Sequence, residues 1–449
     1  MRPPTTTPLK AVDRLVVGLA FLAIAGALVV AVAYDAPLTW DGAYYLFKAL
    51  DLQTPFVTNN RLINVALQQP LLVASQFTSD LGVLRRAFDA GYVLIPLISL
   101  ACAWWFCRSR PALFRWPALG ICVASLPGRI FFVGESTMVT DLFWPLVLGV
   151  LLAAGGVAEL VVLALLAVGV WASHPTAVAL LGLAALVAAA RAWAARPRGR
   201  LWWVVCAICV LLAGTRILLP LSGYELESAS VQRLVEAFDN SVAGRPLAVL
   251  LLAAGVAGLW LLRPLLIRTF GPRMGVAVDV VTPGLIALAG VVLAVWASRP
   301  EQWASALDFR SWQVLVSLGL IVLALADAFW HASASTRWAP VVLACAFSFC
   351  LVLVVQVRSW ARLTRDFEAS LATQPSACTN LTALSETRGS SPLNHWATEL
   401  YAIVLQSRTP SRFILESQAS CTELLTTGSL PIAAWDVRPP NGGWFHLNP

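Results

Sequence analysis

The chain alternates between long runs of apolar residues and shorter polar segments, many of which carry arginine. A helix needs about 20 apolar residues to cross a bilayer core about 30 Å thick. Eleven runs approach this length. They cover residues 13–34, 90–107, 117–133, 139–155, 157–173, 175–191, 201–219, 246–263, 276–298, 311–331 and 339–357. The pattern predicts an all-α polytopic membrane protein with about eleven transmembrane helices.

The composition supports this prediction. Hydrophobic residues make up 59% of the 449 residues and charged residues 12%, and the mean hydropathy is +0.75. Soluble domains average about 45–50% apolar and about 25% charged residues. The net charge of +7 comes from arginines between apolar runs, which act first as topology signals, so we expect no nucleic-acid partner.

The charged residues also predict an orientation, because cytoplasmic loops carry the excess of arginine and lysine. An N-terminus inside the cell places the arginine-rich segments 108–115, 191–200 and 263–273 on the cytoplasmic side. Most acidic residues then fall outside. The sequence thus predicts a transmembrane domain over 1–358 and a small extracytoplasmic C-terminal region over 359–449. The arginine-rich, lysine-poor composition favours a bacterial inner (plasma) membrane.

The first outer loop, residues 35–89, is much longer than most other connections. Long ordered loops are usually functional. Within it, Leu62, Val65 and Ala66 share one face of a predicted helix and polar residues occupy another, which is typical of a helix lying in the membrane interface.

An acid stands near the start of this loop. Asp41 follows Trp40 and precedes Tyr44 and Tyr45. One interpretation is a general base at the outer leaflet, with both tyrosines beside the site. The other is an interfacial aromatic belt in which Asp41 caps the next helix.

Further polar residues lie at two other outer junctions. Arg129 precedes Glu135 and Asp141, either as part of a site or as a structural ion pair. His174 ends another span, where it either caps a helix or faces the same site. The chain has no Walker A, HExxH, GxSxG or paired CxxC motif, so the outer chemistry would rest on acids and arginines.

Arginine is the side chain best suited to a lipid phosphate, because its guanidinium binds phosphate with two parallel hydrogen bonds. The candidates are Arg61 in the first loop, Arg129, and Arg310 at the start of the tenth span. In the C-terminal region, Cys378 and Cys421 are the only two cysteines, and an oxidising compartment would allow them to form a disulfide.

This layout resembles the GT-C superfamily of integral-membrane glycosyltransferases, which includes protein O-mannosyltransferases and the lipid A aminoarabinose transferase. The resemblance covers about residues 10–365 and consists of the first helix, the long first outer loop with Asp41, the acids after the third span and the outer tail. It implies transfer of a sugar from a polyprenyl-phosphate carrier to a lipid, glycan or protein acceptor.

Each role implied by the resemblance belongs to one position. Asp41 would be the general base, Glu135 or Asp141 would orient the acceptor, and Arg61 or Arg310 would hold the departing phosphate. Many relatives have paired acids in the first loop, whereas Gly42 follows Asp41 here. We therefore expect no cofactor and no strict requirement for a divalent metal.

Two other classes of function remain. A secondary transporter or flippase of a lipid or sugar would fit the number of helices, although such proteins typically have repeated halves, and their polar residues lie at the midplane. Asp327 and Arg216 are the nearest residues to that pattern. The third reading is a non-catalytic subunit of an envelope assembly pathway.

Overall fold

The computed structural model describes residues 11–195, 199–221, 246–299, 303–330, 338–373, 376–380, 398–415, 417–427 and 444–445. This part of the chain is almost entirely helical. Its strands are β1 (Cys378–Asn380) and β2 (Phe413–Leu415), which pair in parallel.

Eight described helices are long and apolar enough to cross a membrane. They are α1 (Ala11–Ala33), α5 (Leu81–Cys107), α7 (Glu135–Leu152), α9 (Ala177–Ala194), α10 (Arg200–Leu218), α13 (Pro246–Phe270), α14 (Pro272–Ala297) and α16 (Trp338–Thr373). Three shorter apolar stretches are Pro111–Ala124, Val157–Ser173 and Gln313–Phe329. The prediction of an all-α membrane protein is confirmed; the count of eleven spans stays a prediction.

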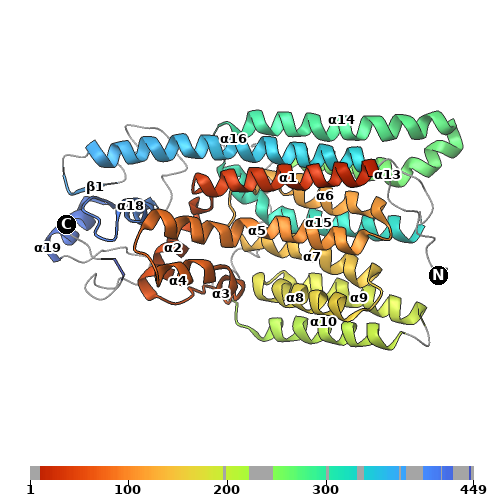
Figure 1. Ribbon diagram of the computed structural model, residues 1–449, viewed down its shortest axis with the longest axis horizontal. Helices are drawn as coiled ribbons and strands as arrows, with labels where there is room; N and C mark the ends of the chain where they lie inside the picture. The colour runs from red at the N-terminus through yellow and green to blue at the C-terminus, as the bar shows by residue number, and fades with distance from the viewer. Residues whose placement is uncertain are drawn as a thin grey trace.

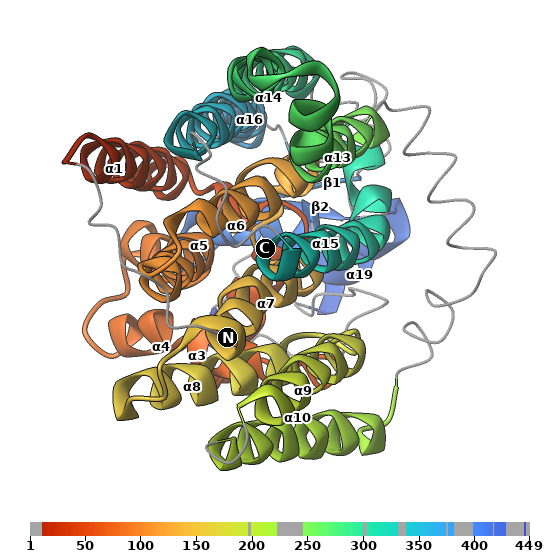
Figure 2. The ribbon, with the colours of Figure 1, turned by 90° about the vertical axis from the view of Figure 1, so that its right-hand side faces the viewer.

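The long helices run side by side around α7 (Figures 1 and 2). Most of α7 is buried, whereas most residues of α10 and α13 are partly or fully exposed. In Figure 2, α8 (Val157–Ser173), α9 and α10 form a layer on one side of α7, and α13, α14 and α16 lie on the other. An apolar surface of this kind suits contact with lipid tails rather than with water.

The segment predicted as a regular span over 117–133 is instead an interrupted helix. It consists of η2 (Pro111–Phe114), α6 (Arg115–Leu119), a π-helical turn η3 (Gly120–Ala124) and η4 (Leu126–Gly128). Proline removes a backbone donor and crowds the preceding turn, which explains the breaks near Pro117 and Pro127. A Cβ on Gly120 would lie 2.3 Å from Nε1 of Trp144, so close packing against α7 requires the glycine.

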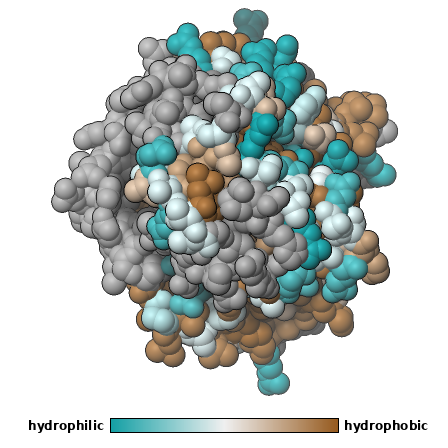
Figure 3. Space-filling view, turned by 90° about the vertical axis from the view of Figure 1, so that its left-hand side faces the viewer, coloured by the Kyte–Doolittle hydropathy of each residue, from teal (hydrophilic) through white to brown (hydrophobic). Residues whose placement is uncertain are grey.

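Short elements gather at the end of the bundle opposite the start of α1 (Figure 1). From the first loop these are η1 (Ala36–Leu38), α2 (Asp41–Leu52), α3 (Ile63–Leu67) and α4 (Gln69–Ser75); from the C-terminal region they are α18 (Thr398–Gln406) and α19 (Gln418–Thr427). Figure 3 looks onto this end, where hydrophilic residues spread over the upper and right-hand parts and hydrophobic ones gather along the lower rim.

Two helices extend across the boundaries predicted between the membrane spans and the outer regions. α5 begins at Leu81, inside the segment 35–89, because the Asp80 carboxylate accepts a hydrogen bond from the backbone N–H of Gly82 at 2.7 Å and so caps the helix. α16 runs past residue 358 to Thr373, so the predicted domain boundary falls within a continuous helix.

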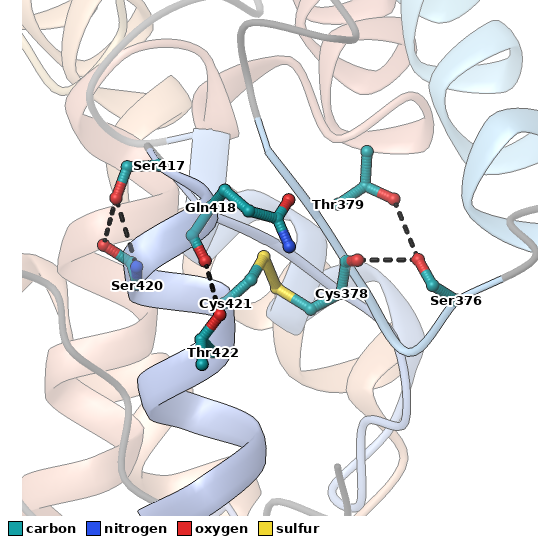
Figure 4. The surroundings of a disulfide bond; sticks show 8 residues. All are labelled: Ser376, Cys378, Thr379, Ser417, Gln418, Ser420, Cys421 and Thr422. Carbon is teal, nitrogen blue, oxygen red and sulfur yellow. Dashed lines mark hydrogen bonds between the residues drawn. A yellow bond between two sulfur atoms is a disulfide. The ribbon is translucent and has the colours of Figure 1, made fainter.

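The C-terminal region contains the disulfide that the sequence allows. Cys378 of β1 is bonded to Cys421 of α19 (Figure 4). The Ser376 hydroxyl donates a hydrogen bond to the Cys378 carbonyl at 2.6 Å. The bond joins the strand pair to the last described helix.

Candidate functional site

The backbone that leads into Asp41 is held in an unusual conformation. Trp40 has φ 57° and ψ −118°, outside the regions that L-residues favour. Just before it, the Thr39 hydroxyl contacts the carbonyls of Ala36 at 2.9 Å and Ile130 at 2.7 Å. Strained residues of this kind persist only where their surroundings fix them, and they cluster at functional sites.

Gly42 is required at the start of α2 by a close backbone approach. A Cβ at this position would lie 1.8 Å from the carbonyl oxygen of Pro37. No side chain fits there without displacing η1 or the first turn of α2. The glycine that follows Asp41 therefore has a structural reason.

Glu135 lies at the centre of the polar contacts at this end. Its side chain accepts hydrogen bonds from the Tyr45 hydroxyl at 2.7 Å and from Arg61 at 2.7 Å, and Asn64 lies at 3.5 Å. Glu135 is only 3% exposed. Because it is the first residue of α7, its carboxylate also faces the positive end of that helix. Residues of α2, of the turn before α3 and of α3 itself thus surround one buried acid of α7.

Asp41 belongs to the same group of residues. It lies one turn before Tyr45 on α2, on the same helical face, and is half-buried. Burial raises the pKa of Tyr45 well above its usual value, and the negative charges of Glu135 and Asp41 raise it further. Tyr45 therefore stays protonated and donates to Glu135, and the structure brings Asp41, Tyr45, Arg61 and Glu135 together.

A chain of amide and hydroxyl groups continues from Glu135 into the first loop. The Tyr92 hydroxyl donates to Asn64 at 2.9 Å, and the Gln68 amide donates to Tyr92 at 3.3 Å. The Gln68 side chain also bonds the backbone N–H and carbonyl of Phe56, at 2.7 and 3.1 Å. Asn64, Gln68 and Tyr92 are buried functional candidates that sequence reasoning missed.

The outer face of α3 is apolar. Leu62 and Val65 are 37% and 40% exposed, and Ala66 is also exposed, whereas Asn64 and Gln68 are fully buried. An exposed apolar face is expected where the outer surroundings are lipid. The predicted grouping of Leu62, Val65 and Ala66 on one face is confirmed, but the buried face is mixed, because Ile63 and Leu67 lie there together with the two amides.

Arg216 joins the site from a distant part of the sequence. Near the end of α10, its guanidinium donates to the backbone carbonyl of Asn60 at 3.0 Å. Asn59 and Asn60 both have positive φ, 50° and 55°. Arg216 thus fixes the strained turn that directly precedes Arg61. The signal in the sequence was an arginine in the last turn of an apolar helix.

Arg129 and Asp141 bind each other. Two guanidinium nitrogens of Arg129 lie 2.7 and 3.1 Å from the carboxylate oxygens of Asp141, and Arg129 also donates to the Ile121 carbonyl at 2.8 Å and to the Ser125 hydroxyl. Both charged residues are buried. The structural ion pair considered from the sequence is present, and it ties the interrupted helix to α7.

The Nδ1 atom of His174 lies 3.0 Å from the Thr176 hydroxyl and 3.3 Å from its backbone nitrogen, as expected for a cap between α8 and α9. The Tyr44 ring packs edge-on against Tyr45 and Phe56. Arg310 belongs to α15 (Ala304–Trp330), and its side chain lies outside the described residues.

Asp327 and Arg216 are the two residues that the transporter interpretation singles out. Arg216 contacts the turn at Asn60. Asp327 accepts hydrogen bonds from Arg115 and from the Trp116 indole, both at 2.8 Å.

Among the described residues, no group of three or more His, Cys, Asp or Glu side chains is arranged to hold a metal ion.

Comparison of the chain with protein-family models, with curated proteins and with solved structures found no match.

Proposed function

We propose that the protein is a membrane glycosyltransferase that moves a sugar from a polyprenyl-phosphate carrier to a lipid, glycan or protein acceptor, with Asp41 as general base. One observation carries the proposal: Asp41, Tyr45, Arg61 and Glu135, which come from three separate segments, gather at one end of the helix bundle. A carboxylate beside a guanidinium is what this transfer needs.

The two acids would have different tasks. Asp41 is half-buried and takes the proton of the acceptor hydroxyl, since a base must reach the proton it removes. Glu135 is buried and holds Tyr45 and Arg61 in place. Arg61 then offsets the negative charge that develops on the phosphate oxygen of the carrier as the sugar leaves. The proton moves from the acceptor to Asp41, and the carrier keeps the bonding electrons.

The other candidates would support this arrangement. The Arg129–Asp141 pair fixes the end of the interrupted helix. Directly after it, the Ile130 carbonyl accepts a hydrogen bond from the hydroxyl of Thr39, which stands two residues before Asp41. His174 positions the start of α9. Arg310 remains the second candidate for the lipid phosphate because the resemblance to the GT-C superfamily implies an arginine there.

The disulfide supports the proposed location. Disulfides persist in oxidising compartments such as the periplasm and the cell exterior. Cys378–Cys421 lies at the same end of the bundle as α2 and α3. We therefore assign this end to the outer face of a bacterial inner membrane and the N-terminus to the cytoplasm, with eleven spans between.

The test is sugar transfer in isolated membranes supplied with polyprenyl-phospho-sugars. Removal of a general base typically costs 10²–10⁴-fold in rate, so we expect Asp41→Asn to lose at least about a hundredfold. Asp51→Asn, a half-buried acid near the other end of α2, is the matched control and should keep activity within about threefold. Full transfer by Asp41→Asn would exclude the proposed base.

One observation favours a secondary transporter as the second candidate. Discontinuous helices frequently line transport sites, and the segment 111–128 is interrupted in this way within the bundle. Uptake of a labelled polyprenyl-phospho-sugar into proteoliposomes, without any transferred product, would favour transport. Product formation without uptake would favour the transferase.

A further inference from the structure

A second buried polar cluster lies at the same end of the molecule, apart from Glu135. It consists of Asp35, which follows α1, and of Arg85 and Asp89 on α5. The Nε atom of Arg85 lies 3.3 Å from an Oδ atom of Asp35. Asp89 is fully buried, although it stands in an α-helix at the edge of an apolar span. None of these residues has a role in the proposed transfer.

The hydrogen bonds of Asp89 show how it is accommodated. No N–H or O–H group of the described residues donates to either of its carboxylate oxygens. The other acid of the cluster is Asp35, which contacts Arg85 one turn before Asp89 on α5. A buried carboxylate that receives no hydrogen bond is strongly disfavoured in its ionised form. The pair of acids therefore holds a proton.

The surrounding charges agree with one shared proton. The charged groups that face Asp35 are Arg85 and Arg86 from α5, Asp89, and Glu368 from α16. Arg86 and Glu368 are exposed to solvent, so Arg85 is the partner of the acid pair at close range. With one proton on the pair, the remaining negative charge balances that of Arg85. Loss of that proton leaves one unbalanced negative charge, and Asp89 is fully buried. Burial raises the pKa of Asp35 against the opposing pull of the two arginines.

The helix α18 docks beside this cluster, through residues of α16. The Trp360 indole of α16 donates to the backbone carbonyl of Asp35 at 3.1 Å. The Tyr401 ring of α18 packs on Trp360, with ring centroids 5.3 Å apart, and on Phe367. The buried Tyr401 hydroxyl makes no hydrogen bond of ordinary geometry to the described residues. It interacts electrostatically with Asp35, Arg85 and Glu368.

We propose that Asp35 and Asp89 form a proton-binding site that controls the docking of α18 on the membrane domain. With one shared proton the cluster is neutral and α18 stays docked. Loss of the proton introduces a buried charge, and water must enter to solvate it, which loosens α18. Because α18 also packs against α2, the helix that carries Asp41, the state of this site reaches the proposed catalytic residues.

The sign of the pH effect follows from linkage. The docked pair holds its proton to higher pH than an exposed aspartate, whose pKa is about 3.9. Docking is therefore strongest at low pH, and it weakens as the pH rises from about 4 through the raised pKa of the docked pair. Within that window the opening constant of α18 rises by up to tenfold for each pH unit. Above it, further increase in pH has no effect.

Two measurements on the full chain in lipid nanodiscs test the proposal. Infrared titration should show the carbonyl band of a protonated carboxyl group at neutral pH, and Asp89→Asn should remove it. Hydrogen exchange of residues 398–406, corrected for the intrinsic pH dependence of exchange, should accelerate with pH in the wild type and become flat in Asp89→Asn. Asp366→Asn, an exposed acid on α16, should behave like the wild type in both.

Each opposite result would overturn the proposal. An unchanged carboxyl band in Asp89→Asn means that the proton is not held here, and flat exchange in the wild type means that the pair does not control α18. If Asp89→Asn does not fold, Asp35→Asn tests the site from the other partner. This variant should also give flat exchange, and a wild-type slope would contradict the proposal. Neither measurement depends on the proposed transferase activity.

Discussion

Glu135, the first residue of α7, and Asp89, in the third turn of α5, are both buried acids at the same end of the molecule, yet their surroundings differ. Glu135 receives hydrogen bonds from Tyr45 and Arg61, with Asn64 close by. Asp89 receives none from the described residues. Neither is more than 3% exposed. The difference therefore lies in the donors and not in the depth of burial.

The donors decide which form of the acid is stable. A buried carboxylate that is paired with a guanidinium and hydrogen-bonded stays charged, whereas one without donors takes up a proton. The first arrangement fixes the side chains around it, and the second responds to pH. At one end of the helix bundle, one buried acid is surrounded by donors and the other has none among the described residues.

The largest expected effect comes from breaking the Glu135 cluster. Arg61→Leu leaves Glu135 buried without its positive partner, and removal of one partner from a buried ion pair typically costs about 3–5 kcal/mol. We expect a loss of that size in the free energy of unfolding, measured by denaturant titration in micelles, together with loss of sugar transfer.

The double variant Arg61→Leu/Glu135→Leu sharpens the comparison. It removes both charges, so much of the lost stability should return while transfer stays absent. Asp89→Leu is the matched change in the other cluster. Because it removes an acid without donors, it should cost less than about 1 kcal/mol at neutral pH. Equal losses for Arg61→Leu and Asp89→Leu would show that the two acids do not differ as inferred.

The next largest effect is expected in the C-terminal region, which lies beside the cluster of Asp35, Arg85 and Asp89. Cys378 and Cys421 are 43 residues apart, and in the chain-entropy model a loop of this length contributes about 4 kcal/mol to the stability of the unit it closes. Cys378→Ser/Cys421→Ser should therefore accelerate hydrogen exchange in α18 and α19. The amides of α3 and of the first turn of α7 should exchange as in the wild type. Equal acceleration there would mean that the two clusters share one cooperative unit.

The apolar pattern predicted the helices well, because the lipid core imposes a length of about 20 residues on each span. α8, for example, occupies the predicted residues 157–173. The interrupted segment 111–128 was missed because most of its residues are apolar, and hydropathy does not register where a proline or a glycine breaks the ladder of backbone hydrogen bonds.

Part of the candidate site was also visible in the sequence. Asp41, Tyr45 and Glu135 were singled out as polar or aromatic residues beside apolar spans. Their convergence was not visible, since no spacing rule connects α2 with α7. For the same reason Arg216 was considered only for a transporter and Tyr92 was missed: a side chain on a span reveals its partner only when the packing of the helices is known.

The smallest effect is expected where a pair of charges is open to water. Arg108 lies 3.1 Å from Glu159, but its side chain is 57% exposed, whereas that of Glu159 is 10% exposed and also accepts the backbone N–H groups of Gly155 and Gly156. Exposed ion pairs typically contribute about 0–1 kcal/mol. Arg108→Ala should therefore lower the free energy of unfolding by less than about 1 kcal/mol, while Glu159→Ala should lower it more because two backbone donors lose their partner. We infer that an ion pair contributes more to stability when its acid is buried and hydrogen-bonded. If Arg108→Ala lowered the free energy of unfolding as much as Arg61→Leu, this inference would be wrong.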